Sequence, residues 1–171
     1  MTLLNSKICI LGDFAVGKTS TVERFVNNHF SDKYLTTIGV KVDTKEIQLT
    51  EYVKLKLIIW DIAGTDRFGP VELAYLRGAS GYILVADGTR AKTVAAALDL
   101  KSQAEERYGE LPYVFLLNKS DLQHSWDVSD QRLDELSQSL TNVFVTSAKS
   151  GDKVDEAIST LGEMIADRES Q

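Results

Sequence analysis

Proline, cysteine and basic charge are all scarce in this chain. Its 2 prolines are too few for a proline-rich linker. Its 1 cysteine excludes a disulfide within the chain and favours a reducing compartment. The formal net charge is −6, so the chain lacks the basic surface that binding to nucleic acid or to an anionic membrane requires. No apolar run reaches the roughly 18 residues of a membrane helix, and residues 1–5 do not resemble a signal peptide.

The rest of the composition is ordinary for a globular domain. Hydrophobic residues make up 43% and charged residues 26% of the chain. A length of 171 residues suits one domain with a core of its own. We therefore expect a single domain over residues 1–171 in a cytoplasmic protein.

Short apolar runs alternate with longer segments of helical periodicity. Buried strands are predicted over residues 7–11, 82–86 and 113–117. Residues 41–49 and 53–60 predict an antiparallel hairpin. Strands interleaved with helices indicate an α/β fold whose mostly parallel sheet binds a ligand at the carboxyl ends of its strands. At this level a flavodoxin-like or a dinucleotide-binding protein fits equally well.

The first predicted strand is followed by GDFAVGKT at residues 12–19. This segment matches the phosphate-loop pattern G-x-x-x-x-G-K-[ST] and opens a predicted helix. Its glycines let backbone N–H groups turn toward a phosphate, and the helix N-terminus adds partial positive charge. In such a loop Lys18 reaches the β- and γ-phosphates, and Thr19 supplies an oxygen for Mg²⁺. Because the loop lies between a strand and a helix, nucleotide binding is favoured over a chance match.

Two further loops follow predicted strands and bear on the base. NKSD at residues 118–121 offers the Asp121 carboxylate, which can accept hydrogen bonds from N1–H and the 2-amino group of guanine. Adenine has neither donor, and charged hydrogen bonds contribute about 1.5–3 kcal/mol each, so Asp121 predicts a preference for guanine. TSAK at residues 146–149 has backbone N–H groups that can bind the guanine 6-oxygen.

With WDIAG at residues 60–64, these loops resemble the full motif set of the Ras superfamily of small GTPases, in order and spacing. TIGV at residues 37–40 and LRGASGYILV at residues 76–85 are similar to the Rab branch in particular. The resemblance implies a P-loop small G domain, an α/β fold with a six-stranded mixed sheet flanked by five helices. It also implies a Rab-like molecular switch in signalling or trafficking, with Mg²⁺ as cofactor, active with GTP and inactive with GDP.

The resemblance further implies the residues of the site. Thr19 and Thr37 would ligate Mg²⁺, and Asp61 would hold the ion through water. Phe30 would pack on the guanine ring, and Gly64 would bind the γ-phosphate. The implied catalytic residues are Lys18, Thr37, Gly64 and Thr65. The implied nucleotide-binding residues are Asp13, Phe14, Ala15, Val16, Gly17, Lys18, Thr19, Ser20, Phe30, Thr37, Gly64, Asn118, Lys119, Asp121, Ser147, Ala148 and Lys149.

Two positions near the expected γ-phosphate depart from the family pattern. Thr65 stands where small GTPases usually have a glutamine that orients the attacking water, and Phe14 stands where a small residue is usual. Threonine lacks the glutamine amide, and a phenyl ring would crowd the water. We therefore expect slow intrinsic hydrolysis and an activator that works without the usual glutamine.

Two other function classes compete with a GTP-hydrolysing switch. A nucleotide-loaded binding module that hydrolyses poorly is favoured by Phe14 and Thr65 and opposed by the intact Mg²⁺ set. A P-loop ATPase or small-molecule kinase is opposed by Asp121.

Partners and localisation also follow from the resemblance. It implies effectors that bind the switch regions, an exchange factor, an activating protein and a monomeric state. Rab-like proteins present three aromatic residues to effectors, and the matching places here are Val42, Trp60 and Leu76, which predicts an apolar surface with one aromatic residue. The chain as given has no C-terminal cysteine, so we expect no lipid anchor and membrane association only through a partner or a missing tail. Cys9 is expected in the core, and Trp126 is expected to be partly buried.

Overall fold

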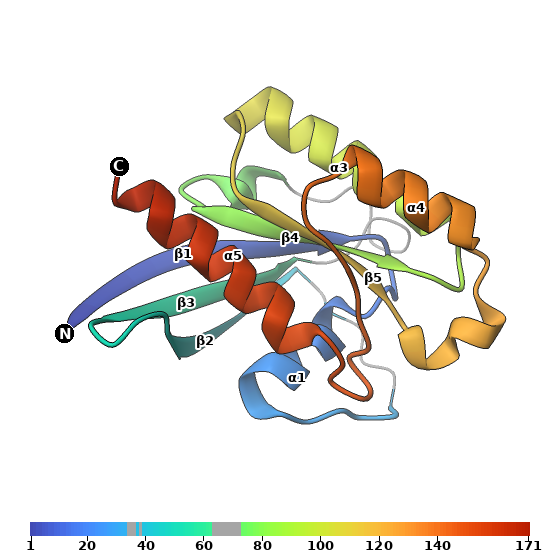
Figure 1. Ribbon diagram of the computed structural model, residues 1–171, viewed down its shortest axis with the longest axis horizontal. Coiled ribbons are helices and arrows are strands. Elements are labelled where there is room, and N and C mark those ends of the chain that lie inside the picture. Colours follow the sequence, from blue (N-terminus) through green and yellow to red (C-terminus); the bar gives the residue numbers. More distant parts are fainter. Residues whose placement is uncertain (34–36, 38, 63–72) are drawn as a thin grey trace.

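A six-stranded mixed sheet forms the centre of the molecule (Figure 1). The computed structural model describes residues 1–33, 37, 39–62 and 73–171. The strand order is β2-β3-β1-β4-β5-β6, and only β2 runs antiparallel to its neighbour. The strands are β1 (Thr2–Gly12), β2 (Val40–Gln48), β3 (Val53–Ile62), β4 (Gly81–Asp87), β5 (Tyr113–Asn118) and β6 (Val143–Val145). The predicted parallel sheet and the β2–β3 hairpin are confirmed.

Helices cover both faces of the sheet. The α-helices of the described residues are α1 (Lys18–Asn27), α3 (Lys92–Tyr108), α4 (Asp130–Ser139) and α5 (Val154–Glu169). Two short 3₁₀ helices, η1 (Leu73–Leu76) and η2 (Ser120–Ser125), lie in connections. α1 and α5 pack on one face, and α3 and α4 on the other (Figure 1). The predicted α/β small G domain fold is confirmed; residues 63–72 lie outside the described part.

The central strands are buried on both sides because alternate side chains enter two different cores. In β4, Tyr82 and Leu84 pack with α3 and α4, whereas Ile83 and Val85 pack with α1 and α5. This accounts for the continuous apolar runs in the sequence. None of the helices in the described residues is long and apolar enough to cross a bilayer.

Cys9 is a core residue of β1, as the sequence predicts. Its side chain is fully buried, and its thiol donates to the carbonyl of Tyr75 at 3.4 Å. Burial raises the pKa of the Cys9 thiol to about 12, against a smaller opposing effect from Lys7. The thiol is therefore protonated and chemically inert at neutral pH.

The parallel strands end together at one edge of the sheet. The ends of β1, β4 and β5 are in register, since Gly12 pairs with Val85 and Asp87 pairs with Asn118. The loops that follow these strands consequently begin side by side, although they are far apart in the sequence.

Truncation of Leu161 tests the packing of α5 on the sheet. Leu161 is 0% exposed and lies in the core that α1 and α5 share with the strands. We expect Leu161→Ala to lower the free energy of unfolding by about 2–5 kcal/mol, because it leaves a cavity. Urea unfolding measures the loss. Glu163→Ala, on the exposed side of the same helix, should change it by less than about 0.5 kcal/mol; equal losses would contradict this packing.

Candidate functional site

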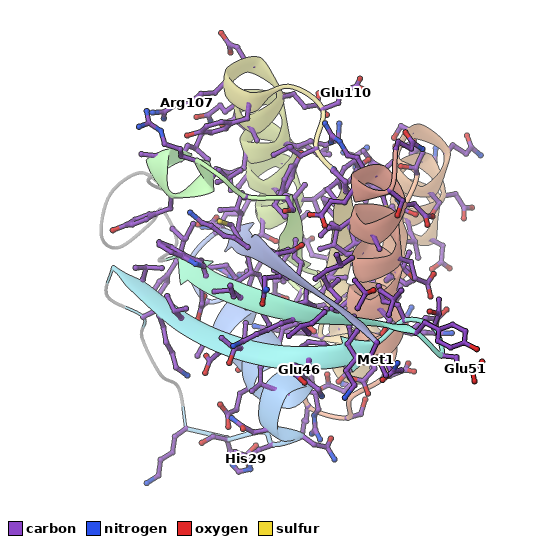
Figure 2. All side chains as sticks on the ribbon, turned by 90° about the vertical axis from the view of Figure 1, so that its left-hand side faces the viewer. Met1, His29, Glu46, Glu51, Arg107 and Glu110 are labelled. Atoms are coloured by element: carbon purple, nitrogen blue, oxygen red, sulfur yellow. The ribbon has the colours of Figure 1, made fainter. Side chains whose placement is uncertain are left out.

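A cleft of about 650 Å³ opens at the edge where the strands end. The residues of the predicted set that line it are Phe14, Ala15, Gly17, Lys18, Thr19, Ser20, Phe30, Thr37, Asn118, Lys119, Asp121, Ala148 and Lys149. Asp13, Val16 and Ser147 belong to the same loops and are buried behind the lining. Gly64 and Thr65 lie outside the described residues. His29 also lines the cleft; it is exposed and lies on the loop after α1 (Figure 2).

The loop between β1 and α1 closes around the Lys18 side chain. The buried ammonium donates to the carbonyls of Gly12 at 3.2 Å and Asp13 at 3.0 Å. Burial lowers the pKa of Lys18, while the charges of Asp61 and Asp13 oppose that shift. The ammonium therefore lies at the floor of the cleft with its charge only partly balanced.

Three side-chain oxygens predicted to surround Mg²⁺ converge beside Lys18. The Thr19 hydroxyl lies 2.6 Å from the Thr37 hydroxyl and donates to Asp61 Oδ2 at 2.5 Å. Thr37 donates to the same oxygen at 3.4 Å. Asp61 Oδ1 is buried and has no hydrogen-bond partner among the described residues. Burial raises the pKa of Asp61, against opposing effects of the Thr19 hydrogen bond and the Lys18 charge.

This oxygen cluster has the chemistry of a magnesium site. Mg²⁺ prefers hard oxygen ligands and binds through few protein groups together with water and phosphate oxygens. Hydroxyls and one carboxylate with a spare buried oxygen meet that requirement. No group of three or more His, Cys, Asp or Glu side chains that could hold a metal occurs within the described ranges, so no rival metal centre is present there.

Asn118 joins the three loops of the cleft. Its amide nitrogen donates to the carbonyl of Val16 at 3.0 Å. Its oxygen accepts from the Ala148 N–H at 3.1 Å and from the Thr146 hydroxyl at 3.3 Å. A Cβ on Gly17 would come within 2.3 Å of the amide nitrogen, so glycine is required for this approach. The Ala148 N–H, predicted as a donor to guanine, thus already has a partner.

Asp121 is held in place by the loop after β6. Its Oδ1 accepts from the Ser147 hydroxyl at 2.8 Å, and that hydroxyl in turn accepts from the Ser150 N–H at 3.0 Å. Asp121 lines the same cleft as Thr19 and Thr37. The carboxylate is therefore oriented before any ligand arrives.

Comparison with known proteins agrees with this arrangement of loops. A family model described as "Ras family" matches residues 7–167. The chain belongs to the Ras family.

Individual relatives of this Ras-family chain include several Rab proteins. Ras-related protein Rab-13 from Bos taurus is 37% identical over 157 residues, which cover 91% of this chain and 77% of that protein. Ras-related protein Rab-7L1 from Homo sapiens is 37% identical over 162 residues, covering 91% and 79%. Ras-related protein Rab-32 from Mus musculus is 34% identical over 172 residues, covering 96% and 77%.

The chain is therefore a Rab-like small GTPase, a molecular switch with a trafficking role that hydrolyses GTP to GDP. Ras and Rab proteins in general bind GTP, GDP and Mg²⁺ and act through regulators and effectors. The family assignment decides against the P-loop ATPase or kinase that the phosphate loop alone left open.

The expected effector surface of this Rab-like GTPase needs one correction. Leu76 is 1% exposed and cannot present its side chain to a partner. In the 3₁₀ helix η1, side chains three residues apart share a face, so Leu73 and Leu76 both enter the core. Tyr75 lies beside Trp60 instead, with ring centroids 5.9 Å apart, and Val42 is 48% exposed. Among the described residues, this surface therefore includes two half-buried aromatic residues, Trp60 and Tyr75.

Sequence reasoning missed two residues at the end of β4. Asp87 is 1% exposed, and its Oδ2 lies 2.8 Å from the Lys119 ammonium and 3.1 Å from Arg90 Nε. Burial raises the pKa of the Asp87 carboxyl, but hydrogen bonds from Lys119 and Thr89 outweigh it and hold the pKa below its usual value. For Asp87, the available signal was its position directly after the predicted apolar strand 82–86.

A third missed residue, Arg24, fastens the loop after β6 to α1. Its Nε donates to the carbonyl of Ala148 at 2.9 Å, and its Nη2 donates to that of Lys149. Its Nη1 donates to Asn28 Oδ1 at 3.1 Å. An arginine in a helical pattern predicts a solvated side chain, so no signal in the sequence pointed to this contact.

Removal of the Asn118 amide tests its role as the junction of the loops. In Asn118→Ala the Ala148 N–H loses its acceptor, and we expect its hydrogen exchange to accelerate about ten- to one-hundredfold. Amide exchange followed by NMR measures the rate. Asn142→Ala is the matched control, because the Asn142 amide makes only long contacts of 3.4–3.5 Å, to the Tyr113 carbonyl, the Thr141 hydroxyl and the Met164 sulfur. Unchanged protection at Ala148 would show that the loops are held by other contacts.

Proposed function

We propose that the cleft binds GTP and GDP with Mg²⁺, and that the predicted residues perform the roles their family pattern gives them. The observation that carries the proposal is the convergence of the Thr19, Thr37 and Asp61 oxygens beside Lys18. A buried cation next to a buried, incompletely paired carboxylate favours a ligand that brings both an anion and a divalent cation. Magnesium-bound nucleotide is such a ligand.

The phosphate end of the cleft is the loop from Asp13 to Ser20, with Lys18 as its charged member. Lys18 pairs with the β- and γ-phosphates, and Gly64 donates its N–H to the γ-phosphate. Thr19 and Thr37 would ligate Mg²⁺ and Asp61 would hold it through water, and the ion when bound would supply positive charge to the phosphates. The 2.6 Å contact of Thr37 with Thr19 supports this, because it places the Thr37 hydroxyl beside the other proposed ligand.

The base end of the cleft reads guanine through Asp121. The carboxylate accepts from N1–H and the 2-amino group, and the hydrogen bond from Ser147 supports its orientation. Phe30 and Lys119 cover the two faces of the ring, and both line the cleft. Asn118 keeps the base and phosphate loops at a fixed separation.

Hydrolysis by this GTPase is slow without a partner. Phe14 lines the cleft at the phosphate loop, where its ring reduces the room for the attacking water. Thr65 cannot orient that water as a glutamine amide does. A nucleotide-loaded module that hydrolyses too poorly to switch is the second candidate, favoured by the same two residues. The Mg²⁺ oxygen cluster favours the switch, because a module without turnover has no need of it.

The partners follow from the same surface. Effectors bind the apolar face of Val42, Trp60 and Tyr75, and the shape of that face selects effectors unlike those of typical Rabs. An exchange factor and an activating protein act on the nucleotide of a monomeric GTPase in the cytoplasm. The net charge of −6 supports the absence of nucleic-acid partners.

Exchange of Asp121 for asparagine tests the base assignment. In Asp121→Asn the 2-position contact changes from acceptor to donor, so we expect GTP affinity to fall at least about a hundredfold and xanthosine triphosphate affinity to rise. Competition against a fluorescent nucleotide measures both. Asp130→Asn, at the exposed start of α4, should leave both affinities unchanged. Full GTP affinity in Asp121→Asn would refute this base-reading role.

Single-turnover hydrolysis tests the roles of Thr65 and Phe14. We expect the unassisted protein to hydrolyse GTP slowly, and Thr65→Gln to raise the rate at least about tenfold by restoring an amide that orients water. Phosphate release from preloaded protein measures the rate. Thr44→Gln, on the exposed side of β2, is the control. A wild-type rate equal to that of Thr65→Gln would contradict the proposal.

A further inference from the structure

Two consecutive carbonyl groups of the phosphate loop are each bound by a cation. Arg90 Nη2 donates to the carbonyl of Phe14 at 2.7 Å. The Lys119 ammonium donates to the carbonyl of Ala15 at 3.1 Å. Arg90 comes from the segment after β4 and Lys119 from the loop after β5, so two different strand ends hold one turn of the phosphate loop.

The two cations share one carboxylate oxygen. Asp87 Oδ2 lies 3.1 Å from Arg90 Nε and 2.8 Å from the Lys119 ammonium. The other oxygen, Oδ1, accepts from the N–H of Thr89 at 2.9 Å and from its hydroxyl at 2.7 Å. Every partner of this buried carboxylate is therefore fixed, and it anchors both cations at once.

Fixing these carbonyls also fixes the direction of the N–H groups that follow. In a trans peptide unit the C=O and N–H bonds point in opposite directions, and no cis peptide bond occurs among the described residues. Holding the carbonyls of Phe14 and Ala15 toward the cations therefore turns the N–H groups of Ala15 and Val16 away from them. Neither N–H donates to an acceptor in the part of the chain that the structure describes. Ala15 lines the cleft and Val16 is buried behind it, so the Ala15 N–H is the one available to an anion.

An arginine is suited to this contact and a lysine is not. The guanidinium presents Nε to Asp87 and Nη2 to Phe14 from one rigid plane, whereas an ammonium on a flexible stem does not hold both acceptors in a fixed geometry. Arg90 does not line the cleft, so its contact with the phosphate loop is indirect.

We propose that Arg90 is a positioning residue for the phosphate loop and slows the release of GDP and GTP. Anchored by Asp87 through Nε, it holds the Phe14 carbonyl through Nη2, and so keeps the Ala15 N–H of the same peptide unit directed at the phosphates. The inference rests on the proposed nucleotide site and adds to it a residue that touches no nucleotide.

Release of a fluorescent GDP analogue tests this role. We expect Arg90→Ala to release the analogue about ten- to thirtyfold faster, since a charge-assisted hydrogen bond to the loop is lost. Arg90→Lys should recover part of that change. Arg132→Ala, which breaks an exposed ion pair of 3.3 Å with Glu135, should release at the wild-type rate.

The ratio of the affinities for GDP and inosine diphosphate shows whether Arg90→Ala affects the phosphate loop alone or the whole cleft, including the base end. Inosine diphosphate lacks the 2-amino group that Asp121 binds, so this preference reports the base end only. The preference should be unchanged in Arg90→Ala, because Asp87 still holds Lys119, which belongs to the base loop. Unchanged release in Arg90→Ala, or a preference that falls as release accelerates, overturns the inference. A wild type that does not bind GDP overturns the proposed function and, with it, this inference.

Discussion

The amide of Asn118 is the contact on which the arrangement of the cleft depends. It bonds to the carbonyl of Val16, 102 residues away in the sequence, and to the N–H of Ala148. Parallel strands bring their carboxyl ends to one edge, but that topology alone places the loops only approximately. The Asn118 amide donates to one neighbouring loop and accepts from another, and so holds the two loops at a fixed separation. The glycine at position 17 follows from this, since any side chain there would displace the amide.

Buried charge around that junction is arranged in complementary groups. Lys18 and Asp61 are both buried, and each reduces the pKa shift that burial imposes on the other. Asp87 is better satisfied, because Lys119, Arg90 and Thr89 supply all of its described contacts. Lys18 and Lys119 line the cleft where ligand charge would enter, whereas Asp61 and Asp87 are buried outside its lining. An acidic protein can thus hold an anionic ligand through local geometry, without a basic surface.

The sequence predicted the fold and the loops of the site because both depend on local patterns. Interleaved apolar runs specify a parallel sheet, and each motif loop directly follows a strand. Contacts between side chains distant in sequence were not predictable in this way. Arg24 and Arg90 have the spacing of solvated residues, and only the folded chain shows that their guanidinium groups bind loop carbonyls. Leu76 was placed wrongly on the surface because a four-residue 3₁₀ helix rotates it inward and leaves Tyr75 outside.

The contacts that sequence reasoning missed all satisfy backbone carbonyls of the loops. Backbone carbonyls in tight loops point away from the ligand and would be left without donors, and leaving a buried carbonyl unpaired costs about 1–3 kcal/mol. Arg24, Arg90 and Lys119 meet this need at Ala148, Phe14 and Ala15. Arg24 reaches the loop after β6 from α1, and Arg90 and Lys119 reach the phosphate loop from the segments after β4 and β5, so these contacts also tie the loops of the cleft together. These contacts therefore give common support to the loops across which the proposed guanine nucleotide lies.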